Sequence, residues 1–174
     1  MLLAVFTVQL AQGQTDDIAA IRKKAVQGNA SAQSQLGFMY EIGRGVAKDE
    51  VEAVNWYRKA AEQGDADAQY NLGFLYANGR GVPKDEVEAV NWYRKAAVQG
   101  NANAQFNLGF MYANGYGVPK DETAAYMWWL LAGGKGNETA RENIPIIEKR
   151  LTSEQRAEGQ RLAKDWKPKT ARGK

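Results

Sequence analysis

The chain of 174 residues contains neither cysteine nor histidine. Without cysteine it can form no disulfide, no thiolate zinc site and no thiol nucleophile, and without histidine it has no imidazole base. These two absences exclude catalysis of the Ser-His-Asp and Cys-His kinds. They leave the cellular compartment open, because a protein without thiols can fold in any redox environment.

Long hydrophobic runs are also scarce. Residues 2–11 (LLAVFTVQLA) form a mostly apolar stretch that is too short to span a bilayer. Its length, followed by the small residues Ala11 and Gly13, predicts a signal peptide at residues 1–13. A buried first helix or an interfacial anchor is the alternative. We therefore expect no stable membrane span and a periplasmic or secreted protein, or a cytoplasmic one if the apolar run is not a signal.

The charge of the chain is small and unevenly placed. The formal net charge is +3, made up of −2 over the first 134 residues and +5 from Lys135 to the end. Binding to nucleic acid requires a basic stripe that follows the phosphates, and the central part of the chain offers none. We therefore expect no nucleic-acid partner.

One stretch of 36 residues occurs three times in succession. Residues 64–99 match residues 28–63 at 27 of 36 positions and residues 100–135 at 21 of 36. A fixed period of this size indicates a stacked array, in which each unit buries its apolar face only against its neighbours. We expect three units, at 28–63, 64–99 and 100–135.

Each unit contains two stretches with helical spacing. In the middle unit the apolar positions are Ala68, Leu72, Gly73 and Tyr76 in the first stretch and Ala89, Trp92, Tyr93 and Ala96 in the second. Gly73 recurs at the same phase as Gly37 and Gly109. A glycine inside a helix costs about 1 kcal/mol relative to alanine. Its recurrence therefore predicts a close approach of the second helix of the same unit.

Polar residues at the boundaries of the helices predict turns and caps. Asp49, Asp85 and Asp121 precede the second helices and are expected to cap them. The Gly-x-Gly of residues 79–81 lacks the preceding strand and the third glycine of a phosphate-binding loop. We expect no catalytic residue, no cofactor and no metal.

The aromatic residues of the second helices allow two interpretations. Trp56, Trp92 and Trp128 share one phase with alanines. Large side chains beside small ones favour packing between helices. A stacking platform for sugars is the alternative, and it would require exposed rings.

The recurring residues resemble Sel1-like repeat proteins, which are α/α-solenoid relatives of tetratricopeptide arrays. The matching residues of the middle unit are Ala66, Ala68, Gln69, Leu72, Gly73, Tyr76, Gly79, Gly81, Val82, Lys84, Asp85, Ala89 and residues 92–97. The resemblance implies an all-α, right-handed solenoid of helix-pair repeats that binds another protein or peptide without catalysis. Secreted members carry a cysteine pair in each repeat. This chain lacks it, which separates it from the relatives labelled as β-lactamases or penicillin-binding proteins.

The two ends of the chain depart from the repeat. Residues 14–27 resemble a lone second helix and predict an N-terminal capping helix. Residues 136–166 predict a degenerate unit and a C-terminal capping helix, with a kink or break at Pro145 and a capping box at residues 152–155. Trp129 and Leu130, apolar or larger than their counterparts, are expected to contact this region. The basic residues 167–174 predict a disordered tail that could touch anionic envelope components.

A partner-binding site is expected where otherwise similar units differ. On the first helices such positions are Ser34, Tyr70 and Phe106, and next to them Gln35, Asn71 and Asn107. Aromatic rings flanked by amides are suited to a peptide, because amides bond its main chain and rings anchor its side chains. The alternative is that Tyr70 and Phe106 pack between neighbouring first helices. We thus expect an exported, non-catalytic scaffold or adaptor. A cell-wall hydrolase is disfavoured because no serine stands in a Ser-x-x-Lys pattern, and a glycan-binding module is the third hypothesis.

Overall fold

The structure, a computed structural model, describes residues 18–169. These residues form helices joined by short turns and contain no strand. A helical segment at residues 18–26 comes first. It is followed by α2 (Ala30–Ile42), α3 (Glu50–Glu62), α4 (Ala66–Asn78), α5 (Glu86–Gln99), α6 (Ala102–Asn114), α7 (Glu122–Gly134), α8 (Glu138–Glu148) and α9 (Ser153–Asp165).

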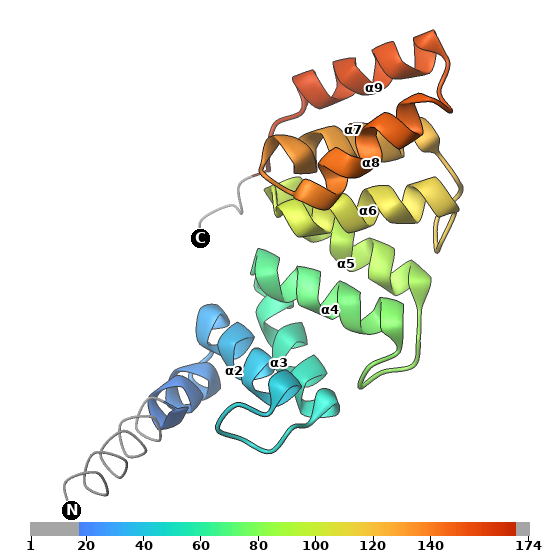
Figure 1. The fold of residues 1–174 in the computed structure, drawn as a ribbon. Helices are drawn as coiled ribbons and strands as arrows, with labels where there is room; N and C mark the ends of the chain where they lie inside the picture. The colour runs from blue at the N-terminus through green and yellow to red at the C-terminus, as the bar shows by residue number, and fades with distance from the viewer. Residues whose placement is uncertain (1–17, 170–174) are drawn as a thin grey trace, which may run out of the picture.

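The helices are stacked in chain order, as Figure 1 shows. The pairs α2 with α3, α4 with α5 and α6 with α7 correspond to the three repeats, and each second helix also packs on the first helix of the next pair. Both α8 and α9 pack on α7 and close that end of the stack. The all-α fold of sequential helix pairs is therefore confirmed. No helix within residues 18–169 has the length and hydropathy needed to cross a bilayer.

The helix ends follow from local sequence. Asp49, Asp85 and Asp121 each accept hydrogen bonds from backbone N–H groups of the first turn, as a capping residue does. Gly79 ends α4 with φ of 67°, in the left-handed region that glycine occupies without strain. The predicted caps are thus confirmed, and these aspartates are committed to helix ends. The capping box of α9, between Thr152 and Gln155, has both of its hydrogen bonds.

The mid-helix glycines let the two helices of a pair approach closely. A Cβ added to Gly73 would lie 2.8 Å from Cδ1 of Tyr93, and one added to Gly37 would lie equally close to Tyr57. In the third pair the residue facing Gly109 is Trp129. Since Tyr57 and Tyr93 are buried, no space exists for a larger residue. The predicted reason for the recurrent glycine is confirmed.

Buried glutamines connect successive repeats. The side-chain amides of Gln33, Gln69 and Gln105 donate to the carbonyl oxygens of Ala25, Ala61 and Ala97, each at 3.0 Å. In the first two repeats the glutamine oxygen accepts from a glutamine 30 residues later, Gln63 or Gln99. The equivalent residue in the third repeat is Lys135, which donates to the Gly100 carbonyl instead. Gln105 Oε1 is therefore buried without a partner among the described residues.

The C-terminal region corrects two predictions. Helix α8 runs through Pro145 and ends at Glu148, so the proline does not break it. The proline lacks an N–H, so one helical hydrogen bond is lost. The next-to-last residue of α8, Ile147, is buried in the apolar cluster that also contains Trp129, and this burial stabilises the end of the helix. Residues 167–169 lie against α5, where the Lys169 N–H donates to the Val98 carbonyl at 2.7 Å. The predicted disorder therefore does not begin at residue 167.

Trp129 and Leu130 belong to the same apolar cluster as residues of α8, as expected. Two further predictions concern residues beyond the described range. The signal peptide at 1–13 and the final residues of the basic tail, 170–174, both lie outside it.

Candidate partner-binding face

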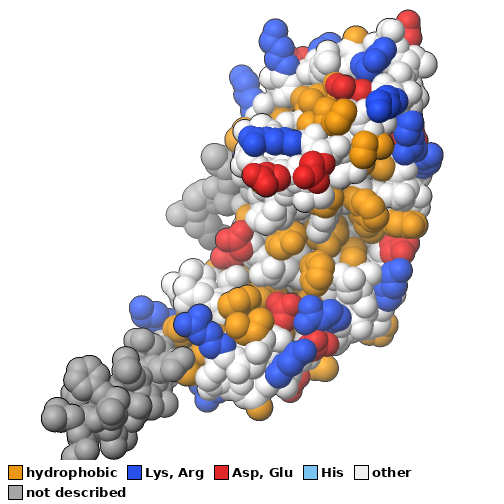
Figure 2. Space-filling view, viewed as in Figure 1, with side chains coloured by type: hydrophobic (Ala, Val, Ile, Leu, Met, Phe, Trp, Pro, Cys, Tyr) orange, Lys and Arg blue, Asp and Glu red, His pale blue; other side chains and the backbone are white. Residues whose placement is uncertain are grey.

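The six residues singled out from the sequence lie on the first helices of the three pairs. They occupy two equivalent positions of α2, α4 and α6, namely residues 34, 70 and 106 and residues 35, 71 and 107. One turn further along the same helices lie residues 38, 74 and 110. Because positions i, i+1 and i+4 share one side of a helix, we name this surface the first-helix face. Figure 2 shows patches of hydrophobic side chains set between charged ones along the stack.

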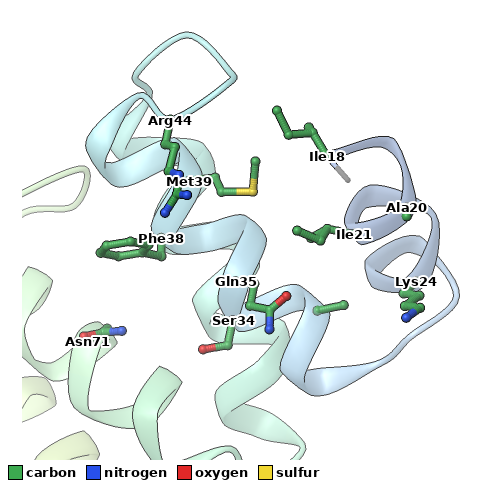
Figure 3. A pocket seen from close by; sticks show the side chains of 11 residues that line it. Ile18, Ala20, Ile21, Lys24, Ser34, Gln35, Phe38, Met39, Arg44 and Asn71 are labelled. Atoms are coloured by element: carbon green, nitrogen blue, oxygen red, sulfur yellow. The ribbon is translucent and has the colours of Figure 1, made fainter. Parts of the chain in front are cut away.

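A cavity of about 600 Å³ opens at the N-terminal end of this face. Ser34 and Gln35 line it from α2, and Asn71 lines it from α4. Figure 3 shows Ile18 and Ile21 of the helical segment directed toward Met39 of α2. The structure thus brings three of the six predicted residues together around one apolar hollow, whose lining also includes Lys24 and Arg44.

The two aromatic candidates are half-buried. The Tyr70 ring lies 6.1 Å from that of Tyr93, and the Phe106 ring is stacked 6.3 Å from that of Trp129. The Trp129 indole N–H also donates to the Phe106 carbonyl at 3.0 Å. Each ring therefore packs on the second helix of its own pair. Neither expected arrangement, free exposure or packing between first helices, describes them.

Sequence reasoning missed a row of phenylalanines on the same face. Phe38 and Phe110 are both 45% exposed, and Phe74 stands between them in the row. They escaped notice because they are identical in all three repeats, whereas binding residues were sought where the repeats differ. The signal was available in the sequence, because each phenylalanine directly follows the buried Leu-Gly pair of its helix.

A charged network joins the first two repeats beside this row. Arg80 donates to Glu50 through Nε and one terminal nitrogen, at 3.0 and 2.8 Å, and to Glu41 at 3.1 Å. Its guanidinium lies 5.9 Å from the centre of the Phe74 ring. Hydrogen bonds from Arg80 and, to a smaller extent, from Lys48 lower the pKa of Glu50. The Tyr57 hydroxyl donates to Glu41 at 2.9 Å, and burial, reinforced by Glu41, raises the pKa of Tyr57.

The junction between the second and third repeats lacks this network. The residue one period after Glu41 is Ala77, and the residue one period after Arg80 is Tyr116. A cavity of about 380 Å³ occupies this position, lined by residues of α4, α5 and α6 and of the turn after α6. Its lining includes Phe74, Glu86, Phe110, Tyr116 and Asn107, the last of which is one of the predicted site residues.

Two of the three equivalent tryptophans, Trp92 and Trp128, are part of the core, and Trp56 is half-buried. Trp92 and Trp128 are each 8% exposed and belong to clusters that join successive repeats. Lys95 covers Trp92 with its ammonium 3.7 Å from the ring centre. The packing interpretation is confirmed, and these two rings offer no open face to a sugar. Residues 18–169 also contain no group of three or more acidic side chains able to hold a metal ion.

Comparison with known proteins decides the family. The Sel1 repeat profile matches the chain three times, at residues 30–65, 66–101 and 102–137. The chain belongs to the Sel1 repeat family. These three Sel1 repeats begin two residues after the units expected from the sequence, and their period is the same.

Solved structures of Sel1 repeat proteins resemble the chain along most of its length. A Sel1 repeat protein from Oxalobacter formigenes is 42% identical over 74% of this chain and 97% of that one, with a TM-score of 0.69. A protective antigen of uropathogenic Escherichia coli that displays a Sel1-like repeat fold is 33% identical, with a TM-score of 0.66. That match covers 86% of this chain and 40% of the antigen. No curated protein matches the chain.

Proposed function

We propose that this Sel1 repeat protein is a non-catalytic scaffold that binds an extended segment of another protein along its first-helix face. The observation that carries the proposal is a row of phenylalanines, repeated every 36 residues and flanked by amides, in which Phe38 and Phe110 are exposed and Phe74 is half-buried. Exposed rings spaced along one face can anchor side chains of one extended chain. The amides of Gln35, Asn71 and Asn107 can donate to and accept from its main chain.

The arrangement suits an extended peptide better than a compact ligand. The two cavities on this face, of about 600 and 380 Å³, are separated along the stack, one beside α2 and the other between α4 and α6. An extended segment could fill both with side chains some residues apart, while a small ligand would occupy only one. We further propose that residues 1–13 act as an export signal, so that the protein meets its partner outside the cytoplasm.

The test is a selection of peptides from a displayed random library by the full chain. Selected peptides are then measured for affinity to Phe38→Ala, Phe110→Ala and Asn71→Ala. We expect each variant to lose about tenfold or more in affinity, the scale of one anchor residue. Val51→Ala is the matched control, because Val51 is 57% exposed but lies on α3, off the first-helix face.

The expected result is loss in the three face variants and none in the control, with all four chains folded by circular dichroism. Equal affinity of wild type and face variants for every selected peptide would refute the proposed surface.

A further inference from the structure

Three equivalent glutamates, one in each repeat, differ in the number of cations that pair with them. Glu50, Glu86 and Glu122 are the first residues of α3, α5 and α7, each 36 residues from the next. Each pairs with the lysine two residues before it, at 3.3, 2.8 and 2.9 Å respectively. Glu50 has a second cation, Arg80, and Glu122 has a second cation, Arg150. Among the ion pairs of residues 18–169, Glu86 has its lysine alone.

The sequence explains why the middle carboxylate differs. The residue that stands one period after Arg80 is Tyr116, which carries no charge. The residue one period after Glu41 is Ala77, whose small side chain leaves space where a carboxylate would lie. The cavity of about 380 Å³ between α4 and α6 is found at this position. The chain thus supplies its own arginine at one repeat junction and leaves the equivalent volume open at the next.

The filled junction shows which group the open one fits. At the filled junction a guanidinium makes two hydrogen bonds to Glu50 and lies over the Phe74 ring. The counterparts in the open cavity are Glu86, whose side chain is 34% exposed, and Phe110. Tyr116 adds a second ring 6.0 Å from that of Phe110. A planar cation is attracted to ring faces and pairs with a carboxylate through parallel hydrogen bonds.

We propose that the cavity between α4 and α6 receives an arginine side chain of the bound partner segment, with its guanidinium paired to Glu86 and placed against Phe110 and Tyr116. This inference rests on the proposed function and adds the residue type that the face selects. Arginine is preferred to lysine because its guanidinium is planar, less strongly hydrated and able to bond through two nitrogens at once. Lys84 need not leave, since Lys48 and Arg80 share Glu50 at the filled junction.

The Tyr93 hydroxyl is a further polar group of this cavity. Its counterpart Tyr57 donates to Glu41, but Tyr93 faces no such carboxylate because residue 77 is alanine. Tyr93 lines the cavity together with Asn107. Both side chains carry oxygen atoms that can accept hydrogen bonds from the remaining N–H groups of a guanidinium, which has five donors to satisfy.

The test uses capped arginine, N-acetyl-arginine amide, as the probe in an NMR titration of the full chain. We expect shifts of the Glu86, Phe110 and Tyr116 backbone signals. Capped lysine should bind several-fold more weakly, and capped citrulline, which has the same shape without charge, should cause no shifts at these signals. Glu86→Gln should weaken binding of the arginine probe about fivefold or more. Glu88→Gln is the matched control, because it removes the same charge two residues away, outside the cavity lining.

A second variant tests the assignment from the opposite direction. Tyr116→Arg restores the arginine that the repeat pattern lacks, and we expect it to pair with Glu86 and to abolish binding of the probe. The effect of Tyr116→Arg on stability should depend on Glu86. In the double variant with Glu86→Gln, the changes in the free energy of unfolding of the two single variants should therefore not add.

Three results would overturn the proposal. Citrulline could bind as well as arginine, or Glu86→Gln could bind the arginine probe as the wild type does. The probe could also bind only to a chain ending at Lys169, which would show that residues 170–174 of this chain occupy the cavity. These failures are distinct from failure of the proposed function: selected peptides could still depend on Phe38 and Asn71 without any dependence on Glu86.

Discussion

Replacing Gly73 with alanine tests the packing on which the whole array depends. In an exposed helix this change would stabilise the protein by about 1 kcal/mol, because alanine has the higher helix propensity. Here the new methyl group would lie 2.8 Å from Tyr93 Cδ1 and 3.2 Å from the Ala89 carbonyl oxygen. Tyr93 is 2% exposed and Ala89 fully buried, so neither can move without displacing its neighbours.

The expected result is a net loss of stability. Overpacking of a buried site costs about 1–3 kcal/mol, and the higher helix propensity of alanine returns about 1 kcal/mol of this, so we expect Gly73→Ala to lower the free energy of unfolding by up to about 2 kcal/mol. For a chain of this size a loss of about 2 kcal/mol corresponds to a fall in Tm of about 4–8 °C. The assay is urea denaturation followed by circular dichroism, with Tm measured in parallel.

Gly134→Ala is the matched control for this prediction. Gly134 is the last residue of α7, and an added Cβ would meet nothing within 4 Å. We expect this variant to be as stable as the wild type or slightly more stable. If Gly73→Ala proved as stable as Gly134→Ala, the close approach of the two helices would be refuted as the reason for the recurrent glycine.

Two further predictions concern buried polar groups. Burial raises the pKa of Tyr93, so the folded chain holds the phenol proton at a pH where the unfolded chain, with a tyrosine pKa of about 10, has lost it. The contribution of Tyr93 to stability is therefore complete below about pH 10 and is lost above it, by about 1.4 kcal/mol per pH unit. We expect the free energy of unfolding of Tyr93→Phe to fall less steeply between pH 10 and 11.5 than that of the wild type, and an unchanged slope would contradict the burial of this hydroxyl. Lys135→Gln should supply the hydrogen-bond donor that Gln105 Oε1 lacks. We expect this variant to be about 1 kcal/mol more stable than Lys135→Ala in urea denaturation. Equal stability of the two variants would show that the Gln105 oxygen has another partner.

Much of the fold could be predicted from the sequence because residues needed for helix ends and helix contacts recur at the same position in all three repeats. The capping aspartates and the glycine packed on Tyr93 were both predicted from recurrence at a fixed phase. Such positions are encoded locally, by the needs of one helix end or one helix contact. Repetition therefore separates structural residues from incidental ones without any knowledge of the three-dimensional arrangement.

The site was predicted only in part, because its features arise between repeats. The Arg80 network joins residues from two units that are 30 and 39 positions away in the chain, and no local pattern indicates which of several acidic residues Arg80 reaches. The phenylalanine row was overlooked because recurrence alone cannot distinguish an exposed recurrent residue from a buried one. The half-burial of Tyr70 depends on the position of Tyr93, which only the packed structure supplies.

Binding of a peptide along the first-helix face can be tested by photo-crosslinking one selected peptide to this face. The photoreactive residue p-benzoylphenylalanine is placed at position 38, at position 110 or, as control, at position 51 on α3. We expect the same peptide to cross-link at both 38 and 110 and not at 51, because it lies extended across successive repeats. Cross-linking at position 51 with none at 38 or 110 would place the partner on the second helices and contradict the central claim.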